Sequence, residues 1–360
     1  MCSKNNTNNS DCQVFERLED SYISAKSGKR KERPWREKKE QNMQLSDVYR
    51  YIDMSKSERL EKCANYLQFR RYSDGSLKLN TMNSCRVRLC PVCQWRRSLK
   101  NYYNNKRICD YLMSRDDCGS WLALTLTMSS VNADELCNAL DMLVYGFNKL
   151  TKQFDFKRIS RGYYRGIEVT HDSNEYITPA DYKRRKKWLD SKGLKVGDAN
   201  PTFDLYHPHM HVLVYVNKSY FTSRHYLNHD KWVEIWRQAL AVDYQPQVDI
   251  KKVKNLSQDL CADGISGAIA EVSKYATKAT DYLTGDLAKD VPTVACLDKA
   301  LNNRRLIGYG GELLQAKKAL KLEDADSGDL VNVDGEAATA DDYELISYFW
   351  NTGLRDYGRE

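Results

Sequence analysis

The sequence predicts an α+β fold in which a central, largely antiparallel sheet carries flanking helices and follows a small cysteine-rich region. Three segments, at residues 121–130, 161–171 and 207–216, show the alternation of a strand. With the helices predicted around them, the order is strand, helix, strand, strand, helix, strand and helix, which is typical of an α+β domain. Cysteines gather ahead of the first strand, between residues 63 and 93.

The chain has 360 residues, of which 41% are hydrophobic and 29% charged, and its net charge is +7. This length can bury a sizeable core in two or three domains, and the positive charge permits a polyanionic partner. No apolar run approaches the roughly 18 residues of a membrane helix, and residues 1–20 lack a secretory apolar stretch. We therefore expect no membrane association, a cytoplasmic location, and cysteines that are reduced thiols or metal ligands.

Composition divides the chain into four regions. Residues 1–45 are polar and basic and are predicted to form a disordered arm. Residues 46–115 hold the cysteine-rich region and a basic helix, and residues 116–285 hold the central sheet. In the C-terminal region, 286–360, residues 322–344 contain nine acidic and no basic side chains, which predicts an acidic, partly disordered tail.

The first predicted elements follow the spacing of apolar residues. A helix begins at Ser46 and continues through Leu60, and residues 95–113 have the pattern of a basic amphipathic helix. In the strand at 121–130, leucines alternate with alanine and threonine, and residues 132–154 have helical spacing.

The later elements follow in the same way. In the strand at 161–171, Ile167 and Val169 face opposite to Glu168. A polar insertion, residues 172–200, contains the basic run KRRKK and leads to the third strand. The remaining predictions are a strand at 207–216, an amphipathic helix at 230–240, a short strand at 248–253 and a long helix at 264–283.

The third strand, HPHMHVLVYV, holds three of the six histidines. His207, His209 and His211 share one face of the strand, whereas Met210 and Val212 point the other way, toward the expected core. Histidine is the commonest metal ligand, and two imidazoles two residues apart on a strand can converge on one ion. We expect the histidine face to bind a metal; the alternative is structural or solvated histidines.

The cysteine-rich segment contains CRVRLCPVC, with cysteines at 85, 90 and 93 and the C-x-x-C pair Cys90 and Cys93. Together with Cys63, these three cysteines would supply the four thiolates of a closed structural zinc site. The alternatives are a redox pair, which lacks the surrounding βαβ pattern, and a cluster of buried thiols. A basic helix beside this site would aim Arg and Lys at phosphates.

The predicted helix at 264–283 carries Glu271 and Tyr275 four residues apart, hence on one face, with Lys278 within reach. A solvated stripe of these residues is common, so the pattern alone indicates little. Its interest lies in the histidine strand and the Glu168 strand that precede it.

Taken together, these motifs resemble a known family. HPHMHVLVYV looks like the histidine–hydrophobe–histidine (HUH) motif of single-strand DNA endonucleases, and the chain more closely resembles the single-tyrosine rolling-circle replication initiators of plasmids. The resemblance covers roughly residues 50–315. Its motifs, in order, are CRVRLCPVC, LALTLTMSS, the Glu168 strand, HPHMHVLVYV, the Trp232/Trp236 helix, EVSKYATKATDYL and RRLIGYGG.

The resemblance implies an HUH-type nuclease domain over residues 116–285 with one catalytic divalent ion. His209 and His211 match its ligands, Glu168 is the third ligand, and His207 either coordinates or orients the site. Mixed histidine and carboxylate ligation suits Mn²⁺ and tolerates Mg²⁺.

Tyr275 matches the nucleophile of that family, and Glu271 matches the carboxylate that single-tyrosine initiators use in place of a second tyrosine. Attack on origin DNA would leave a 5′-phosphotyrosyl link and a free 3′-hydroxyl, and Lys278 would help to activate the tyrosine. Tyr282, seven residues after Tyr275, is the alternative nucleophile.

The expected function is therefore metal-dependent, site-specific nicking and closing of single-stranded DNA at a plasmid origin. The sequence has no G-x-x-x-x-G-K-[ST] phosphate loop, so a host helicase would unwind the duplex and a host polymerase would extend the 3′ end. The alternatives are an HUH transposase or relaxase, a phosphodiesterase that attacks with water, and a non-catalytic zinc-containing regulator that binds DNA.

Overall fold

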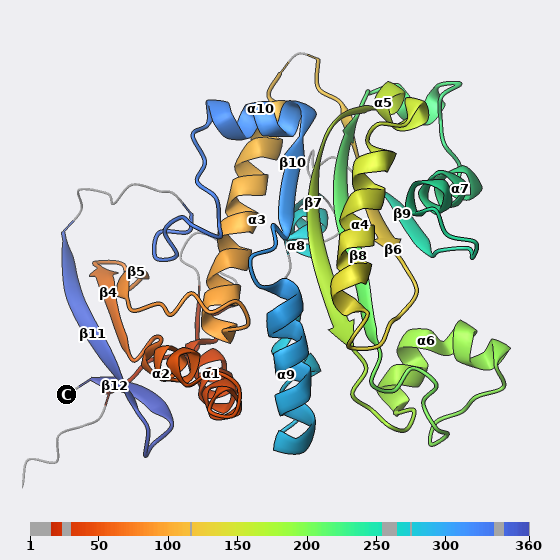
Figure 1. Cartoon of the computed structure of the whole chain (residues 1–360). Coiled ribbons are helices and arrows are strands. Elements are labelled where there is room, and N and C mark those ends of the chain that lie inside the picture. Colours follow the sequence, from red (N-terminus) through yellow and green to blue (C-terminus); the bar gives the residue numbers. More distant parts are fainter. Residues whose placement is uncertain are drawn as a thin grey trace, which may run out of the picture.

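The structure is a computed structural model that describes residues 16–23, 30–115, 117–253, 265–273, 276–334 and 342–359. In these residues it contains two five-stranded sheets and a two-stranded hairpin, with α3 (Pro91–Met113) running between the two larger sheets (Figure 1). Every strand pair is antiparallel. The predicted α+β architecture with an antiparallel sheet and flanking helices is confirmed.

The central sheet contains the strands that the sequence predicts and one more at its edge. Its order is β10 (Ile307–Gly310), β7 (Ser160–His171), β8 (Tyr206–Val216), β6 (Ser120–Thr127) and β9 (Val248–Val253). Leu124 and Val212, which are almost fully buried, are paired neighbours at its centre.

Helices cover both faces of this sheet. One face packs against the cluster that includes α4 (Leu136–Leu150), α7 (His229–Leu240) and α9 (Leu287–Leu301); α5 (Phe154–Ile159) lies at the start of β7. The other face packs against α3, α8 (Ile265–Val272) and α10 (Gly311–Ala319). Figure 1 shows α4 in front of the sheet and α8 behind it.

The expectation that only one face of the histidine strand is packed was wrong. Leu213 and Tyr215, on the same face as the histidines, are completely buried. They belong to the cluster that includes Ile108 of α3, Ile269 of α8 and Leu313 of α10. The histidines therefore lie at the open end of a face that helices close elsewhere.

The second sheet is built from both ends of the chain, so we call it the terminal sheet. Its order is β1 (Glu16–Arg17), β12 (Asp356–Arg359), β11 (Tyr343–Asn351), β4 (Tyr66–Tyr72) and β5 (Leu77–Met82), and β2 (Ser21–Ile23) pairs with β3 (Arg30–Glu32) nearby. The pairing of β11 with β4 joins the C-terminal region to the cysteine-rich region.

Parts of the N-terminal arm, which we expected to be disordered, and of the acidic tail, which we expected to be partly disordered, are structured. The helix predicted from Ser46 begins earlier, as α1 (Trp35–Tyr49), because Trp35 packs edge-on against Trp95 with ring centroids 4.7 Å apart; α2 (Met54–Lys62) follows. Residues 1–15 and 24–29 of the predicted arm lie outside the described residues.

The acidic segment, which we define as residues 322–334, lies along α3 rather than free in solvent. Arg96 Nε donates to the Leu330 carbonyl at 2.8 Å, and Lys100 Nζ donates to Glu323 Oε2 at 2.5 Å. Cations of the basic helix, which we expected to point at phosphates, therefore contact this acidic segment instead at Arg96 and Lys100.

The prediction of one helix over residues 264–283 was wrong. Helix α8 ends at Val272, and a short 3₁₀ turn, Ala279–Asp281, follows. The cause is tertiary: the Ala276 carbonyl accepts a hydrogen bond from Val169 N at 2.7 Å, which draws this part of the chain against β7. Tyr275 lies outside the described residues.

The closed packing of the histidine face can be tested at Leu213. We expect Leu213→Ala to lower the free energy of unfolding by about 2–5 kcal/mol, because a fully buried leucine is lost. The measurement is urea unfolding followed by circular dichroism. The control is Met142→Ala on α4, where the side chain is exposed and the change should stay within about 0.5 kcal/mol. A similarly small loss at Leu213 would contradict the packing.

Candidate functional site

The pairing of β7 with β8 brings one carboxylate and two imidazoles together. In the register, Glu168 lies opposite His209 and Gly166 lies opposite His211. The ligand atoms of Glu168, His209 and His211 all lie within 4.8 Å of one another. Glu168 Oε2 lies 2.9 Å from His211 Nε2 and 3.3 Å from His209 Nε2.

The surroundings fix which nitrogen of each ring faces the carboxylate. His209 Nδ1 lies 3.2 Å from the His207 carbonyl, which can only accept, so the imidazole donates there and its Nε2 is turned toward Glu168. His211 Nδ1 is held by the Thr125 hydroxyl at 3.2 Å. This arrangement of outer hydrogen bonds is typical of metal-ligating histidines.

Burial and hydrogen bonding act on Glu168 in opposite directions. Burial alone would raise its pKa, but the contacts with the imidazoles of His209 and His211 outweigh that effect, and the pKa lies well below its usual value. Glu168 is therefore a charged carboxylate between two imidazoles. One oxygen and two nitrogen ligands suit a divalent ion and leave coordination positions open for a substrate oxygen.

His207 lies outside this group of three. Its Nδ1 is 3.3 Å from the Ser130 hydroxyl, and its ring stacks on His209 with centroids 5.4 Å apart. Burial lowers its pKa to about 4, so the ring is neutral at pH 7. Of the two roles that we considered for His207, this placement matches that of orienting His209.

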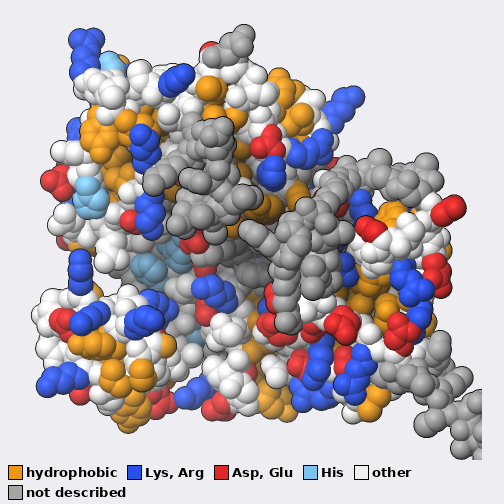
Figure 2. Space-filling view, turned by 180° about the vertical axis from the view of Figure 1, so that it is seen from behind, with side chains coloured by type: hydrophobic (Ala, Val, Ile, Leu, Met, Phe, Trp, Pro, Cys, Tyr) orange, Lys and Arg blue, Asp and Glu red, His pale blue; other side chains and the backbone are white. Residues whose placement is uncertain are grey.

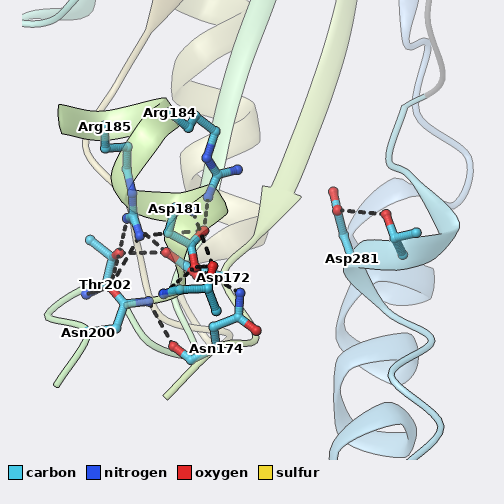
Figure 3. Close-up of polar contacts among 10 residues, drawn as sticks. Asp172, Asn174, Asp181, Arg184, Arg185, Asn200, Thr202 and Asp281 are labelled. Atoms are coloured by element: carbon cyan, nitrogen blue, oxygen red, sulfur yellow. Dashed lines mark hydrogen bonds and ion pairs between the residues drawn. The ribbon is translucent and has the colours of Figure 1, made fainter. Parts of the chain in front are cut away.

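The polar insertion between β7 and β8 does not disturb their register. It contains α6 (Pro179–Ser191), which begins with a capping box between Thr178 and Asp181. Arg185 turns back to Asp172 at 2.9 Å and to the Thr202 hydroxyl at 2.5 Å, and these contacts close the insertion onto the strand ends (Figure 3).

The surface around the histidines is rich in cations. Figure 2 shows histidine side chains at the surface of this face, with Lys and Arg side chains around them. On α6, the side chains of four basic residues are exposed: Lys183, Arg184, Lys186 and Lys187.

The residues on either side of Tyr275 are fixed to the sheet and to α3. Ser98 Oγ donates to the Ser273 carbonyl at 2.7 Å, and Asn105 Nδ2 donates to Ser273 Oγ at 3.0 Å. On the other side, Ala276 bonds to Val169, the neighbour of Glu168. Ser273 is thus fixed to α3, and Ala276 is fixed to the strand that carries Glu168.

Glu271 and Lys278 do not share a helix face as predicted. Glu271 is exposed near the end of α8, whereas Lys278 is exposed at the start of the following 3₁₀ turn. Tyr282, the alternative nucleophile, is buried, and its hydroxyl donates to the Leu89 carbonyl at 2.6 Å. The structure therefore gives Tyr282 a packing role.

Asp281 is a carboxylate near this site that our sequence reasoning missed. Burial, with a further contribution from the charge of Glu168, raises its pKa to about 6, although Lys278 opposes the shift. Its Oδ2 is buried and has no hydrogen-bond partner among the described residues. Figure 3 shows Asp281 apart from the cluster that closes the insertion. Nothing in the sequence distinguishes it from other aspartates.

The four predicted cysteines form one buried cluster. Cys63 Sγ lies 3.7 Å from the sulfurs of Cys90 and Cys93, and Cys85 Sγ lies 3.8 Å from Cys93. Four thiolates at about 2.3 Å from one tetrahedral zinc ion would be about 3.8 Å apart, so the cluster fits an ion of that size. The prediction that Cys63 joins the other three agrees with this geometry.

The cluster has a buried cation beside it. Lys39 is completely buried, and its Nζ donates to the Cys63 and Glu61 carbonyls at 2.8 and 2.7 Å. Burial lowers the pKa of Lys39 to about 8, against the opposing charges of the cysteines. Burial also raises the pKa of the Cys90 thiol, whereas hydrogen bonds from the neighbouring cysteines lower the pKa of Cys93. A bound cation would favour the thiolate form of Cys90 at neutral pH.

The fold and the two clusters define a protein with two candidate metal centres, one of cysteines and one of glutamate and histidines. A family model described as "Replication protein" matches residues 76–358. The chain belongs to this family of plasmid replication initiators.

Individual relatives agree. "Protein rep" of Bacillus amyloliquefaciens is 35% identical over 94% of this chain and 97% of that protein. A "Protein rep" of a Bacillus species is 37% identical over 77% of this chain and 85% of its own length. The "Protein rep" of Lactiplantibacillus plantarum is 34% identical over 91% of this chain and 95% of its own length. No solved structure matches the chain. Among the described residues, no helix has the length and apolarity to span a membrane.

The cysteine centre can be tested by metal analysis. We expect Cys93→Ser to lose about one equivalent of bound metal and to unfold at lower temperature, because a structural ion contributes directly to folding. Inductively coupled plasma mass spectrometry and thermal unfolding measure the two effects. Cys118→Ser is the control, since Cys118 lies outside the cluster. Unchanged metal content in Cys93→Ser would contradict a four-cysteine centre.

The raised pKa of Asp281 predicts a pH-dependent difference in stability. The folded protein holds this proton up to about pH 6, whereas a free aspartate releases it near pH 3.8, so wild-type stability falls as pH rises between these values. Relative to wild type, Asp281→Asn should gain about 1–3 kcal/mol between pH 4 and pH 7. Urea unfolding without added divalent ions measures the gap, and a gap that does not vary with pH would contradict the burial of this charge.

Proposed function

We propose that the protein initiates rolling-circle replication by nicking one strand of plasmid origin DNA and rejoining the ends at termination. The observation that carries the proposal is the convergence of Glu168, His209 and His211 from two paired strands, in a chain that belongs to a family of plasmid replication initiators. The antiparallel sheet with a histidine pair at its centre supports assignment to the HUH type of endonuclease.

In this proposal, Glu168, His209 and His211 hold one divalent ion, Mn²⁺ or Mg²⁺, and His207 orients His209. A bound ion would polarise the scissile phosphate and offset the negative charge that develops during displacement. The exposed cations of α6, which lies between the two ligand-bearing strands in sequence, would supply positive charge for a single strand.

Tyr275 is the proposed nucleophile. Its hydroxyl loses a proton to solvent, its oxygen attacks the phosphorus and the bond from phosphorus to the 3′ oxygen breaks. The leaving 3′ oxygen takes up a proton from solvent, and the 5′ phosphate stays on the tyrosine. The hydrogen bond from Val169 to Ala276 supports this role, because it ties the residue after Tyr275 to the residue after Glu168. The burial of Tyr282 supports Tyr275 over this alternative nucleophile.

Glu271 and Lys278 have supporting roles in the proposal. Lys278, exposed close to Tyr275 in sequence, would favour the ionised tyrosine. Glu271, exposed at the end of α8, would accept the proton of a water or an incoming hydroxyl at termination.

We further propose that the cysteine centre holds structural zinc. The sulfur spacing, the complete burial of Cys90 and Cys93 and the neighbouring Lys39 support this assignment. Cys90 also caps α3, since its sulfur accepts from Cys93 N at 3.4 Å, so zinc would fix the start of that helix. Host helicase and polymerase remain the proposed partners, since the chain lacks a phosphate-loop motif.

The test is formation of a covalent protein–DNA adduct. Single-stranded oligonucleotides tiled across the origin would be incubated with wild-type protein and Mn²⁺ and analysed on denaturing gels. We expect an adduct whose digestion and mass spectrometry identify Tyr275. Tyr275→Phe and His209→Ala should each lower the adduct yield at least 100-fold, which is on the order of the effect of removing a catalytic group.

Tyr282→Phe is the matched control, because it removes a buried tyrosine hydroxyl seven residues from Tyr275 and should keep the adduct. Cleavage without an adduct would favour a phosphodiesterase that attacks with water. Binding without cleavage under any divalent ion would favour a non-catalytic regulator.

A further inference from the structure

A narrow cleft with both polar and apolar walls lies between α3 and β7, on the side of the sheet that carries the metal ligands. Its volume is about 40 Å³, and its walls include Gln94, Arg97 and Asn101 of α3, Gly166 of β7, Ala276 and Asp326. Gly166 is two residues before Glu168, on the same face of the strand, and Ala276 directly follows Tyr275. The cleft thus adjoins the proposed active site.

Three side chains that line the cleft have buried polar atoms without a hydrogen-bond partner among the described residues. Arg97 is 9% exposed; its Nη2 donates to the Arg86 carbonyl at 3.1 Å, but its Nε and Nη1 have no hydrogen-bond partner among the described residues. The amide oxygens of Gln94 and Asn101 are also buried without a partner there. A buried donor without an acceptor costs about 1–3 kcal/mol, more when charged, so this guanidinium is suited to a ligand.

A carboxylate from the acidic segment points at this guanidinium. Asp326 Oδ1 lies 2.9 Å from Arg88 Nη1 but 3.7 Å from Arg97 Nε, a distance too long for a hydrogen bond. The Asp326 side chain is 34% exposed, and it belongs to a segment without regular secondary structure. Asp326 therefore occupies the mouth of the cleft without satisfying Arg97.

A phosphate group fits these donors better than the carboxylate does. Guanidinium groups bind phosphate oxygens through two parallel hydrogen bonds, and Arg97 has Nε and one Nη available. The cleft has room for a few water molecules but is too small for a nucleobase. Those waters would donate to the amide oxygens of Gln94 and Asn101 while they hydrate the phosphate.

We propose that Arg97, with Arg88, binds a backbone phosphate of the DNA strand adjacent to the scissile phosphate, and that Asp326 holds this position until DNA displaces it. The inference rests on the proposed function, because it takes single-stranded DNA as the substrate. It adds a contact that would position the strand relative to the metal ligands and Tyr275.

The experiment replaces one phosphate at a time by a neutral methylphosphonate in the oligonucleotide that wild-type protein binds most tightly. Fluorescence anisotropy gives the Kd of each. We expect one position at which wild-type affinity falls about tenfold. Arg97→Gln should bind unmodified DNA with about tenfold lower affinity. The methylphosphonate at that position should cause no further loss of affinity in this variant. Its plot of log K against log salt should also be shallower by about 0.7.

The matched control is Lys106→Gln, which makes the same change in charge on the exposed side of α3 and should keep the sensitivity at that position. Asp326→Asn keeps Arg97 and removes the competing charge, so it should bind unmodified DNA about three- to tenfold more tightly. This second variant keeps the proposal testable if Arg97→Gln fails to fold.

Two results would overturn the phosphate site: Arg97→Gln that keeps the full methylphosphonate effect, or Asp326→Asn that binds no more tightly than wild type. Adduct yield, measured on the same oligonucleotides, separates this failure from that of the proposed function. A wild-type adduct together with either result would refute the phosphate site alone, whereas absence of any wild-type adduct would refute nicking.

Discussion

The pairing register of β7 with β8 is the constraint on which the site depends. Side chains alternate across a strand, so a slip of one residue would turn Glu168 away from His209 and His211 and move the apolar side chains of the shifted strand to the opposite face. Because β8 is buried on both faces, such a slip is costly in either direction. The long insertion leaves this register intact because Arg185 and Asp172 close it at its base.

Helix α3 links the two metal centres. It begins at the cysteine cluster, where Cys90 is its cap, and it reaches the end of α8, where Ser98 and Asn105 hold Ser273. Figure 1 shows it between the two sheets. A change at the cysteine cluster would therefore reach Ser273 through one helix, and under the proposed function the cysteines would act by positioning rather than by chemistry.

The sequence predicted those features of the fold that depend on the short-range pattern of residues. Alternation located four strands of the central sheet, and spacing pointed to the histidines and cysteines as candidate ligands, whereas Glu168 was implied by the family resemblance. Long-range contacts decided the rest. The end of α8 depends on the bond from Val169 to Ala276, and the burial of Asp281 depends on its neighbours in space. Edge strands as short as β10 give too few residues for a period, and the acidic segment showed its charge but not its partner on α3.

The terminal sheet has a consequence for synthesis. Strand β4 emerges early from the ribosome, but its neighbour β11 is among the last segments to be made. Until translation ends, β4 presents an open sheet edge, which is a template for pairing with other chains. The last segments to be made therefore cover that edge. A chain that stops short of β11 would keep the edge of β4 exposed, and this exposure would favour aggregation or degradation.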